Sequence, residues 1–163
     1  MARPRAEWGV QRGPAGFDAV YAAERPAIVR LAFLLVRDQA VAEELAQEAF
    51  LRLYAHMDTV DNPPGFLRTV VVRLASTWRT RRAMEAQRLT LVAADGRRVR
   101  DEHEVDETWD AIGRLRPERA EVLVLRFYED LDHREIGRIV GCSAGTARSR
   151  LRRALADLKE ELS

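Results

Sequence analysis

Apolar residues recur every three or four positions along most of this chain, and this period limits the folds it can adopt more than any other feature. Between residues 41 and 54, two adjacent rows of apolar residues repeat at every fourth position: Val41, Leu45, Ala49 and Leu53, beside Ala42, Ala46, Phe50 and Tyr54. That spacing places the side chains on one wide face of an α-helix, whereas a strand needs alternation, which no segment shows clearly. The sequence therefore predicts an all-α fold.

Two interruptions of the helical pattern predict two small domains. The stretch Asn62-Pro63-Pro64-Gly65 breaks the chain, and residues 84–104 carry mixed charge with few large apolar side chains. We expect a flexible lead-in at 1–16, a helical domain at 17–83, a polar linker at 84–104 and a second helical domain at 105–163. Within the first domain, Pro26 is expected to start or kink a helix. A third helix is expected to bury one face: Phe66, Val70, Leu74 and Trp78.

Helix-start and helix-stop signals agree with one another between residues 131 and 158. Asp132 is a good N-cap for a short helix, and Glu135 completes the pattern of a capping box. Gly141 suits the left-handed end of that helix, and Ser143 suits the start of a longer one. Gly137 leaves room for the second helix to approach closely. This layout predicts a DNA-binding helix-turn-helix.

The second helix of this motif has two different faces. Its apolar face is expected to pack on the first helix and the core: Ala147, Leu151, Ala154, Leu155 and Leu158. Its other sides carry the candidate contacts to duplex DNA: Thr146, Arg148, Ser149, Arg150, Arg152 and Arg153. The alternative is an arginine-rich face that is only solvated. Formal net charge is +1 and Lys159 is the only lysine, so neither overall charge nor the use of arginine separates the two.

Charge is segregated within the first domain. Residues 37–61 hold two arginines and six acids (2 − 6 = −4), whereas residues 66–100 hold nine arginines and two acids (9 − 2 = +7). An acidic helix face with Leu51 among its carboxylates suits a basic protein partner, although a solvated acidic face is the simpler alternative. A basic helix with an aromatic residue can bind a single strand and stack a base. Trp78 could do so, but its spacing also fits the core.

Other chemistry is not indicated. Cys142 is the only cysteine, His56, His103 and His133 are widely separated, and no phosphate loop, nucleophile elbow or acid–base pair is visible. We therefore expect no catalysis, no cofactor and no metal. No apolar run approaches the length of a membrane span, and the N-terminus lacks the apolar core of a secretory signal. A cytoplasmic protein without membrane insertion is expected.

The stretch LRPERAEVLVLRFYEDLDHREIGRIVGCSAGTARSRLRRALADL resembles conserved region 4 of bacterial sigma-70 family factors, most closely the extracytoplasmic-function group. The first half, from FDAVYAAERPAIVRLAFLLVRDQAVAEELAQEAFLRLY to PPGFLRTVVVRLASTWRTRR, resembles region 2 of the same group. The resemblance implies a subunit that binds core RNA polymerase and directs it to promoters. Region 4 is expected to read the −35 element as duplex DNA and region 2 to hold the −10 element.

The resemblance also implies roles for residues and partners. The expected −35 contacts are the six residues of the second helix given above, of which the resemblance carries over Arg148, Ser149, Arg152 and Arg153 by position. The expected −10 contacts are Arg68, Arg73, Trp78, Arg79, Arg81 and Arg82. The expected contacts to the clamp of the largest polymerase subunit are Asp38, Glu43, Glu44, Gln47 and Glu48, and region 4 is expected to bind the polymerase flap. An anti-sigma protein is an implied partner.

The third helix departs from the family pattern, because Phe66, Arg73 and Thr77 stand where many members have Trp, Asn and Asp. These changes bear on the preferred −10 bases. Two other functions remain open at this point. One is a stand-alone helix-turn-helix regulator, which would bind symmetric duplex sites without polymerase. The other is a helical protein-interaction module whose arginines only keep it in solution.

Overall fold

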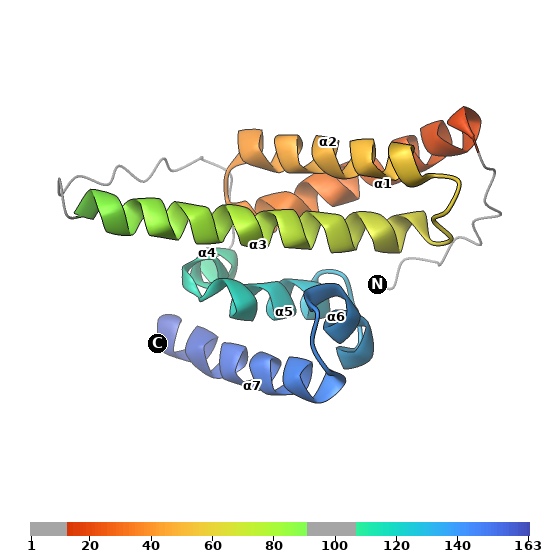
Figure 1. Cartoon of the computed structure of the whole chain (residues 1–163). Helices are drawn as coiled ribbons and strands as arrows, with labels where there is room; N and C mark the ends of the chain where they lie inside the picture. Colours follow the sequence, from red (N-terminus) through yellow and green to blue (C-terminus); the bar gives the residue numbers. More distant parts are fainter. Residues whose placement is uncertain (1–12, 91–106) are drawn as a thin grey trace.

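The computed structural model describes residues 13–90 and 107–163, and in these ranges all regular structure is α-helical. The helices are α1 (Pro14–Val36), α2 (Gln39–His56), α3 (Pro63–Thr90), α4 (Glu107–Arg114), α5 (Pro117–Phe127), α6 (His133–Val140) and α7 (Ala144–Glu161). In Figure 1, α1 and α2 lie along one side of α3, and α4 to α7 lie along the other. The predicted all-α fold is confirmed.

α1 is one helix, although its sequence contains a proline. Of the two predicted effects of Pro26, a helix start or a kink, the start is wrong, because Pro26 lies inside the helix. Pro26 is exposed, so the backbone carbonyl that loses its donor faces water. Val20 on one side of the proline and Ile28 on the other are both buried, so both halves of the helix pack against the core. The helix begins at Pro14, inside the predicted lead-in, and residues 1–12 of that lead-in lie outside the described residues.

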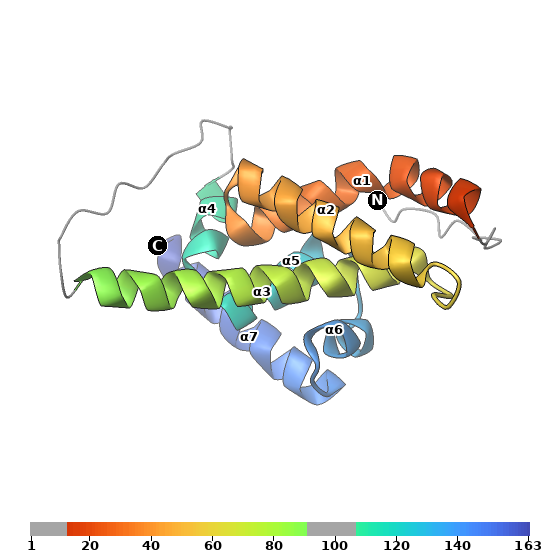
Figure 2. The ribbon, with the colours of Figure 1, turned by 45° about the horizontal axis from the view of Figure 1, so that its top comes forward.

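α3 continues to Thr90 and so replaces the first part of the predicted linker with helix. Residues 83–87 are Ala, Met, Glu, Ala and Gln, which all favour helix. The residues from Thr80 to Leu89 are exposed, so an apolar period could not reveal this extension. Figures 1 and 2 both show the end of α3 projecting beyond the other helices. The rest of the predicted linker lies outside the described residues.

The buried side of α3 is displaced from the predicted one. Leu67, Val71 and Ala75 are fully buried, whereas Phe66, Val70, Leu74 and Trp78 are half-buried. The displacement arises because other helices pack on two different sides of α3. It packs on α1 and α2 along one side and on α5 and α6 along another, where Val72 is buried.

The last four helices pack directly on the first three. α5 contacts α1, α3, α6 and α7, and its residues Ala120 to Leu125 are consecutively buried. Such a run has no solvent face because helices lie on opposite sides of it. α4 adds a contact to α1. A single apolar core therefore runs from α1 through α5 to α7.

Candidate nucleic-acid and polymerase interfaces

The start of the helix-turn-helix is fixed by reciprocal hydrogen bonds. The Asp132 carboxylate accepts from the backbone N–H groups of Arg134 (2.9 Å) and Glu135 (2.8 Å), and the Glu135 side chain accepts from the Asp132 N–H (2.9 Å). The predicted capping box is thus present. The bonds from the Glu135 and Arg134 amides favour the ionised carboxylate and hold the pKa of Asp132 below its usual range.

The turn after α6 requires two glycines. Gly141 ends the helix with φ 76°, a left-handed conformation that favours glycine. The amide of Cys142 donates to the Gly137 carbonyl at 2.8 Å, which folds the turn back over α6. A Cβ on Gly137 would lie 2.5 Å from the Cys142 carbonyl oxygen. The close approach that Gly137 permits is therefore made by the backbone of the turn, not by the body of the second helix.

α7 begins at the predicted cap and buries most of the predicted face. Ser143 accepts from the Thr146 amide at 3.1 Å, and Ala147, Leu151 and Ala154 are buried. Leu155, predicted for the same face, is 42% exposed. It lies about 70° around the helix from the centre of the buried face, so it forms the edge of the contact with α5 and α6.

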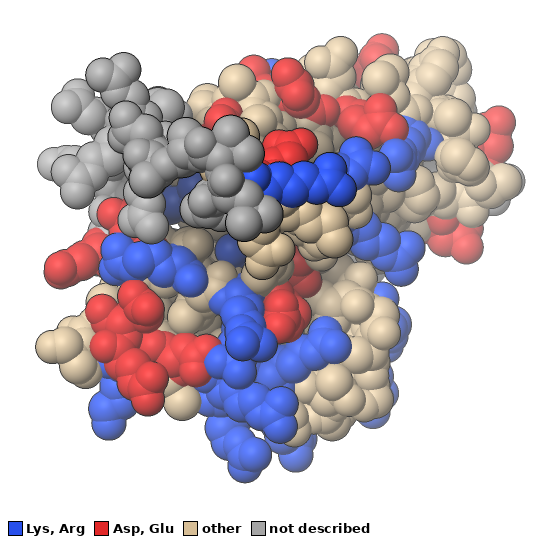
Figure 3. Space-filling view, turned by 60° about the vertical axis from the view of Figure 1, so that its left-hand side comes forward, with Lys and Arg blue, Asp and Glu red and all other residues tan. Residues whose placement is uncertain are grey.

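The opposite side of α7 is open and basic. Arg148, Arg152 and Arg153 are exposed, and in the described part of the chain none of them forms an ion pair. A shallow groove of about 560 Å³ is lined by Ser143, Gly145, Thr146, Ser149, Arg150 and Arg153. In Figure 3 the basic side chains gather at the lower edge, the level at which α7 lies in Figure 1. Four of the six predicted −35 residues thus line this groove, namely Thr146, Ser149, Arg150 and Arg153, and the other two, Arg148 and Arg152, are exposed on the same helix.

The predicted −10 residues of α3 fall into three groups. Arg73 and Arg81 are exposed. Trp78 is half-buried against the core, and the Arg82 guanidinium lies 5.2 Å from the centre of its ring. Arg68 and Arg79 instead face the last four helices.

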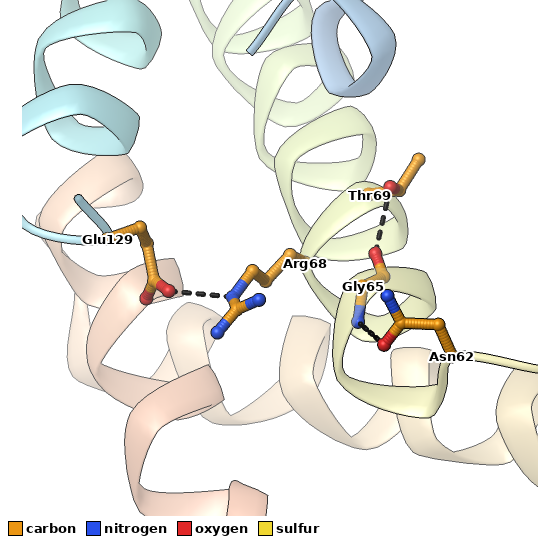
Figure 4. A network of polar contacts seen from close by, with 5 residues as sticks. All are labelled: Asn62, Gly65, Arg68, Thr69 and Glu129. Atoms are coloured by element: carbon orange, nitrogen blue, oxygen red, sulfur yellow. Dashed lines mark hydrogen bonds and ion pairs between the residues drawn. The ribbon is translucent and has the colours of Figure 1, made fainter. Parts of the chain in front are cut away.

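Arg68 is paired with a carboxylate from the other half of the chain. Its Nε donates to Glu129 Oε2 at 2.7 Å, and the Glu129 side chain is only 6% exposed (Figure 4). At the adjacent start of α3, Asn62 Oδ1 accepts from the Gly65 amide at 3.1 Å, and the Thr69 hydroxyl donates to the Gly65 carbonyl at 2.9 Å. These bonds hold the first turn of α3, from which Arg68 reaches Glu129.

Further arginines of the first three helices join the two halves. Arg37, in a left-handed conformation after α1, forms an ion pair with Asp110 of α4. The Arg30 guanidinium lies 5.9 Å from the centre of the Tyr128 ring. The contact between the halves is therefore rich in arginine on one side and in acceptors on the other.

Glu121 was not predicted as a site, and it is a buried carboxyl at this contact. It is 6% exposed, and its Oε1 has no hydrogen-bond partner among the described residues. Burial, the largest effect, raises the pKa of Glu121 to about 7, although the Ser76 hydroxyl and the Arg79 charge favour ionisation. Arg79 donates to the Leu115 carbonyl at 3.1 Å, while its other terminal nitrogen lacks a partner in the described part of the chain, and burial lowers the pKa of Arg79. The sequence signal was the position of Glu121 inside the otherwise apolar run AEVLVL.

The predicted polymerase-binding residues of α2 are mostly exposed. Asp38 instead caps α2, because its carboxylate accepts from the Val41 amide at 3.0 Å. Glu43 accepts from Gln39 at 3.0 Å, and Glu48 pairs with Arg52 at 2.7 Å. Glu44 and Gln47 are exposed and beside Leu51 and Tyr54, which are 58% and 59% exposed. Tyr54, predicted for the core, belongs to this open face.

Comparison with known proteins identifies the family. The model for sigma-70 region 2 matches residues 20–84, and that for sigma-70 region 4 matches residues 106–158. An RNA polymerase sigma-E factor of Streptomyces coelicolor is 30% identical over 151 residues, which cover 90% of this chain and 85% of that protein. The chain belongs to the sigma-70 family. It is a sigma factor of the extracytoplasmic-function group, and it directs transcription initiation without being an enzyme.

Two further similarities concern sequence and fold. The RNA polymerase sigma-E factor of Streptomyces antibioticus is 33% identical over 154 residues, which cover 90% of this sigma factor and 84% of that protein. The sigma factor RpoE of Bartonella quintana, solved in complex with the anti-sigma factor NepR, has the same fold with a TM-score of 0.73. It is 22% identical and covers 91% of this chain and 98% of its own.

Region 2 of this sigma factor corresponds to α1–α3, and region 4 corresponds to α4–α7. The family sets aside both the stand-alone regulator and the interaction module. No described helix is long and apolar enough to cross a membrane, and the described residues contain no cluster of His, Cys, Asp and Glu that could hold a metal ion.

Proposed function

We propose that region 4 recognises the −35 element through the groove and exposed arginines of α7. The observation that carries this proposal is that Arg148, Arg152 and Arg153 form no ion pair with the described residues and lie in or near a groove lined by four small residues and two arginines. Gly145 and Ser149 let the helix lie deep between the phosphates. Arginine can then form two hydrogen bonds with a guanine edge or neutralise a phosphate.

Region 2 engages the −10 element through α3. Arg73 and Arg81 offer exposed charge for the DNA backbone. Trp78 has the Arg82 guanidinium over its ring and is half-buried, so little of the ring is free to stack a base. Its role in −10 binding is therefore to position α3 and Arg82. Arg68 and Arg79 can join the DNA contact only after region 4 leaves them.

The open face of α2 binds the clamp of the largest subunit of core polymerase, and region 4 binds the flap. Glu44 and Gln47 are available for a basic partner, and Leu51 and Tyr54 add apolar surface among the charges. Exposed aromatic and leucine side chains inside a charged rim are typical of protein interfaces. Asp38, by contrast, contributes by starting α2.

An anti-sigma protein is a further partner, supported by the similar fold of the RpoE sigma factor in its complex with NepR. We place the site of action in the cytoplasm, with polymerase and promoter DNA.

Run-off transcription with core polymerase tests the proposal. Core polymerase with this chain should initiate at specific sites on genomic fragments, and core polymerase alone should not. Arg153→Ala should reduce initiation at those sites, whereas Lys159→Ala, which changes a charge near the end of α7 and outside the groove, should not. Equal loss of initiation for both variants would refute the assignment of the groove to the −35 element.

A further inference from the structure

Region 4 lies on the helix that region 2 is proposed to offer to DNA. α3 contacts α5 and α6, and its Arg68 and Arg79 bond to Glu129 and to the Leu115 carbonyl. This arrangement, in which region 4 covers one side of α3, is called the closed chain below.

The closed chain is too short to serve both promoter elements. Their names place the −10 and −35 elements about 25 base pairs apart, which is about 85 Å of duplex at 3.4 Å per pair. α3 touches α5 and α5 touches α7, so two helix-to-helix steps separate the proposed −10 and −35 readers, about 20 Å in all. If the proposed function holds, the contact between α3 and region 4 must open before both elements are bound.

That contact contains a carboxyl that is poorly accommodated as a charge. Glu121 lies on α5 with α3 against it, and its Oε1 is buried without a hydrogen-bond partner in residues 13–90 and 107–163. The charged groups that face it in the described chain are Arg79 of α3, Glu118 of its own helix and Arg150 of α7. Neither Arg79 nor Arg150 makes a hydrogen bond to it within normal distance, and the free nitrogen of Arg79 is itself buried and unpartnered.

We propose that closing of region 4 onto α3 takes up a proton at Glu121, so that the equilibrium between closed and open chains depends on pH. The physical reason is the difference in hydration. Opening exposes the carboxyl to water, where the ionised form is stable. Closing removes that water and supplies only the Ser76 hydroxyl and distant charges in exchange.

The direction of the effect follows from linkage. In the open chain the carboxyl has its ordinary pKa near 4.5, and in the closed chain its pKa is about 7. At a pH below the two pKa values, Glu121 is protonated in the open and in the closed chain. At a pH above them it is ionised in each, so the ratio of open to closed chains does not depend on pH in these ranges. Between them the closed chain binds more protons, and the ratio of open to closed chains rises by up to tenfold per pH unit. Arginine stays charged throughout, so the titrating partner is the carboxyl.

Energy transfer between two dyes on the full-length chain tests this inference without polymerase or DNA. Cys142→Ser removes the native thiol, and Ala55→Cys on α2 with Ala156→Cys on α7 provides exposed attachment points, one in each region. Transfer should fall as pH is raised from 5.5 to 7 and level off above that, because the closed fraction falls. A profile that does not change over this range would overturn the proposal.

Three variants assign the effect to Glu121. Glu121→Gln keeps the shape of the neutral acid, so transfer should stay high and independent of pH. Ser76→Ala removes a hydroxyl that favours ionisation and should move the midpoint to higher pH; it also serves if Glu121→Gln does not fold. Glu118→Gln, an exposed change on the same helix, should keep the pH dependence and move its midpoint slightly lower. If Glu121→Gln titrates like the parent chain, another group is responsible and the proposal is wrong.

The two proposals fail separately. If core polymerase with this chain does not initiate at specific sites, the proposed function is refuted, but the pH dependence of energy transfer is unaffected. A flat transfer profile would remove the proton-linked closing and leave the transcription result untouched.

Discussion

Replacement of Gly137 by alanine should destabilise region 4, although the same change usually stabilises a helix. Gly137 lies inside α6, where alanine is favoured over glycine by about 1 kcal/mol. The added Cβ would lie 2.5 Å from the Cys142 carbonyl oxygen and 3.2 Å from the Ser143 carbonyl carbon. These are backbone atoms, so the turn between α6 and α7 must move to make room.

The magnitude follows from what that movement disrupts. Forcing a methyl group into a packed site costs about 1–3 kcal/mol. Moving the turn also weakens the bond from the Cys142 amide to the Gly137 carbonyl, 2.8 Å long, which contributes about 1 kcal/mol. The lost hydrogen bond and the gain in helix propensity are of similar size and opposite sign. A net loss of about 1–3 kcal/mol therefore remains.

Urea unfolding followed by far-UV circular dichroism measures this loss, and Gly145→Ala is the matched control. Gly145 lies in the first turn of α7, and the nearest atom to an added Cβ is the Ser143 hydroxyl oxygen at 3.9 Å, an ordinary contact. The control should raise the free energy of unfolding by up to about 1 kcal/mol. If Gly137→Ala is as stable as the parent chain, the reasoning that the turn cannot yield is refuted.

Three more substitutions test the interfaces. Arg153→Ala should weaken binding to cognate −35 duplex by on the order of 1–3 kcal/mol in a titration with labelled DNA, and equal loss at a scrambled site would reduce its role to a phosphate contact. Glu44→Arg should weaken binding to core polymerase in a pull-down titration with an unchanged dichroism spectrum, whereas Glu160→Arg, the same charge change on α7, should bind normally. Arg68→Ala leaves the buried Glu129 carboxylate without its partner, which should destabilise the closed chain by about 3 kcal/mol and lower energy transfer between the dyes. Unchanged transfer would show that this ion pair does not hold region 4 on α3.

Local signals in the sequence were sufficient for the helix-turn-helix. Asp132, Glu135, Gly141 and Ser143 act within one or two turns of their own position, and each has the role that its residue type predicts. Caps and turns depend on hydrogen bonds between near neighbours, so the rest of the fold cannot easily override them. The open face of α7 was predictable for the same reason, because its core-facing side was marked by alanine and leucine.

Contacts between distant segments were not predictable in this way. The buried side of α3 differs from the apolar stripe because a second set of helices covers Val72 and the side on which Arg68 and Arg79 lie. Periodicity shows that a helix has an apolar face, but it does not show how many neighbours the helix will have. Glu121 is the sharpest case, because a glutamate in a helical run is normally assigned to solvent. Its burial follows only from the packing of α5 between α3 and α7.

The same property of arginine explains both the closed chain and the proposed DNA contact. A guanidinium forms charge-assisted hydrogen bonds equally well with a carboxylate and with a phosphate. Glu129 therefore offers Arg68 what a DNA backbone would offer, and the two compete for one side chain. The apparent affinity of α3 for DNA in the full chain is then lowered in proportion to the fraction of chains that are open. Because the contact contains a carboxyl that loses hydration on closing, the proposed proton linkage predicts that a rise in pH, like a polymerase surface that binds the open form, shifts the equilibrium toward the open chain.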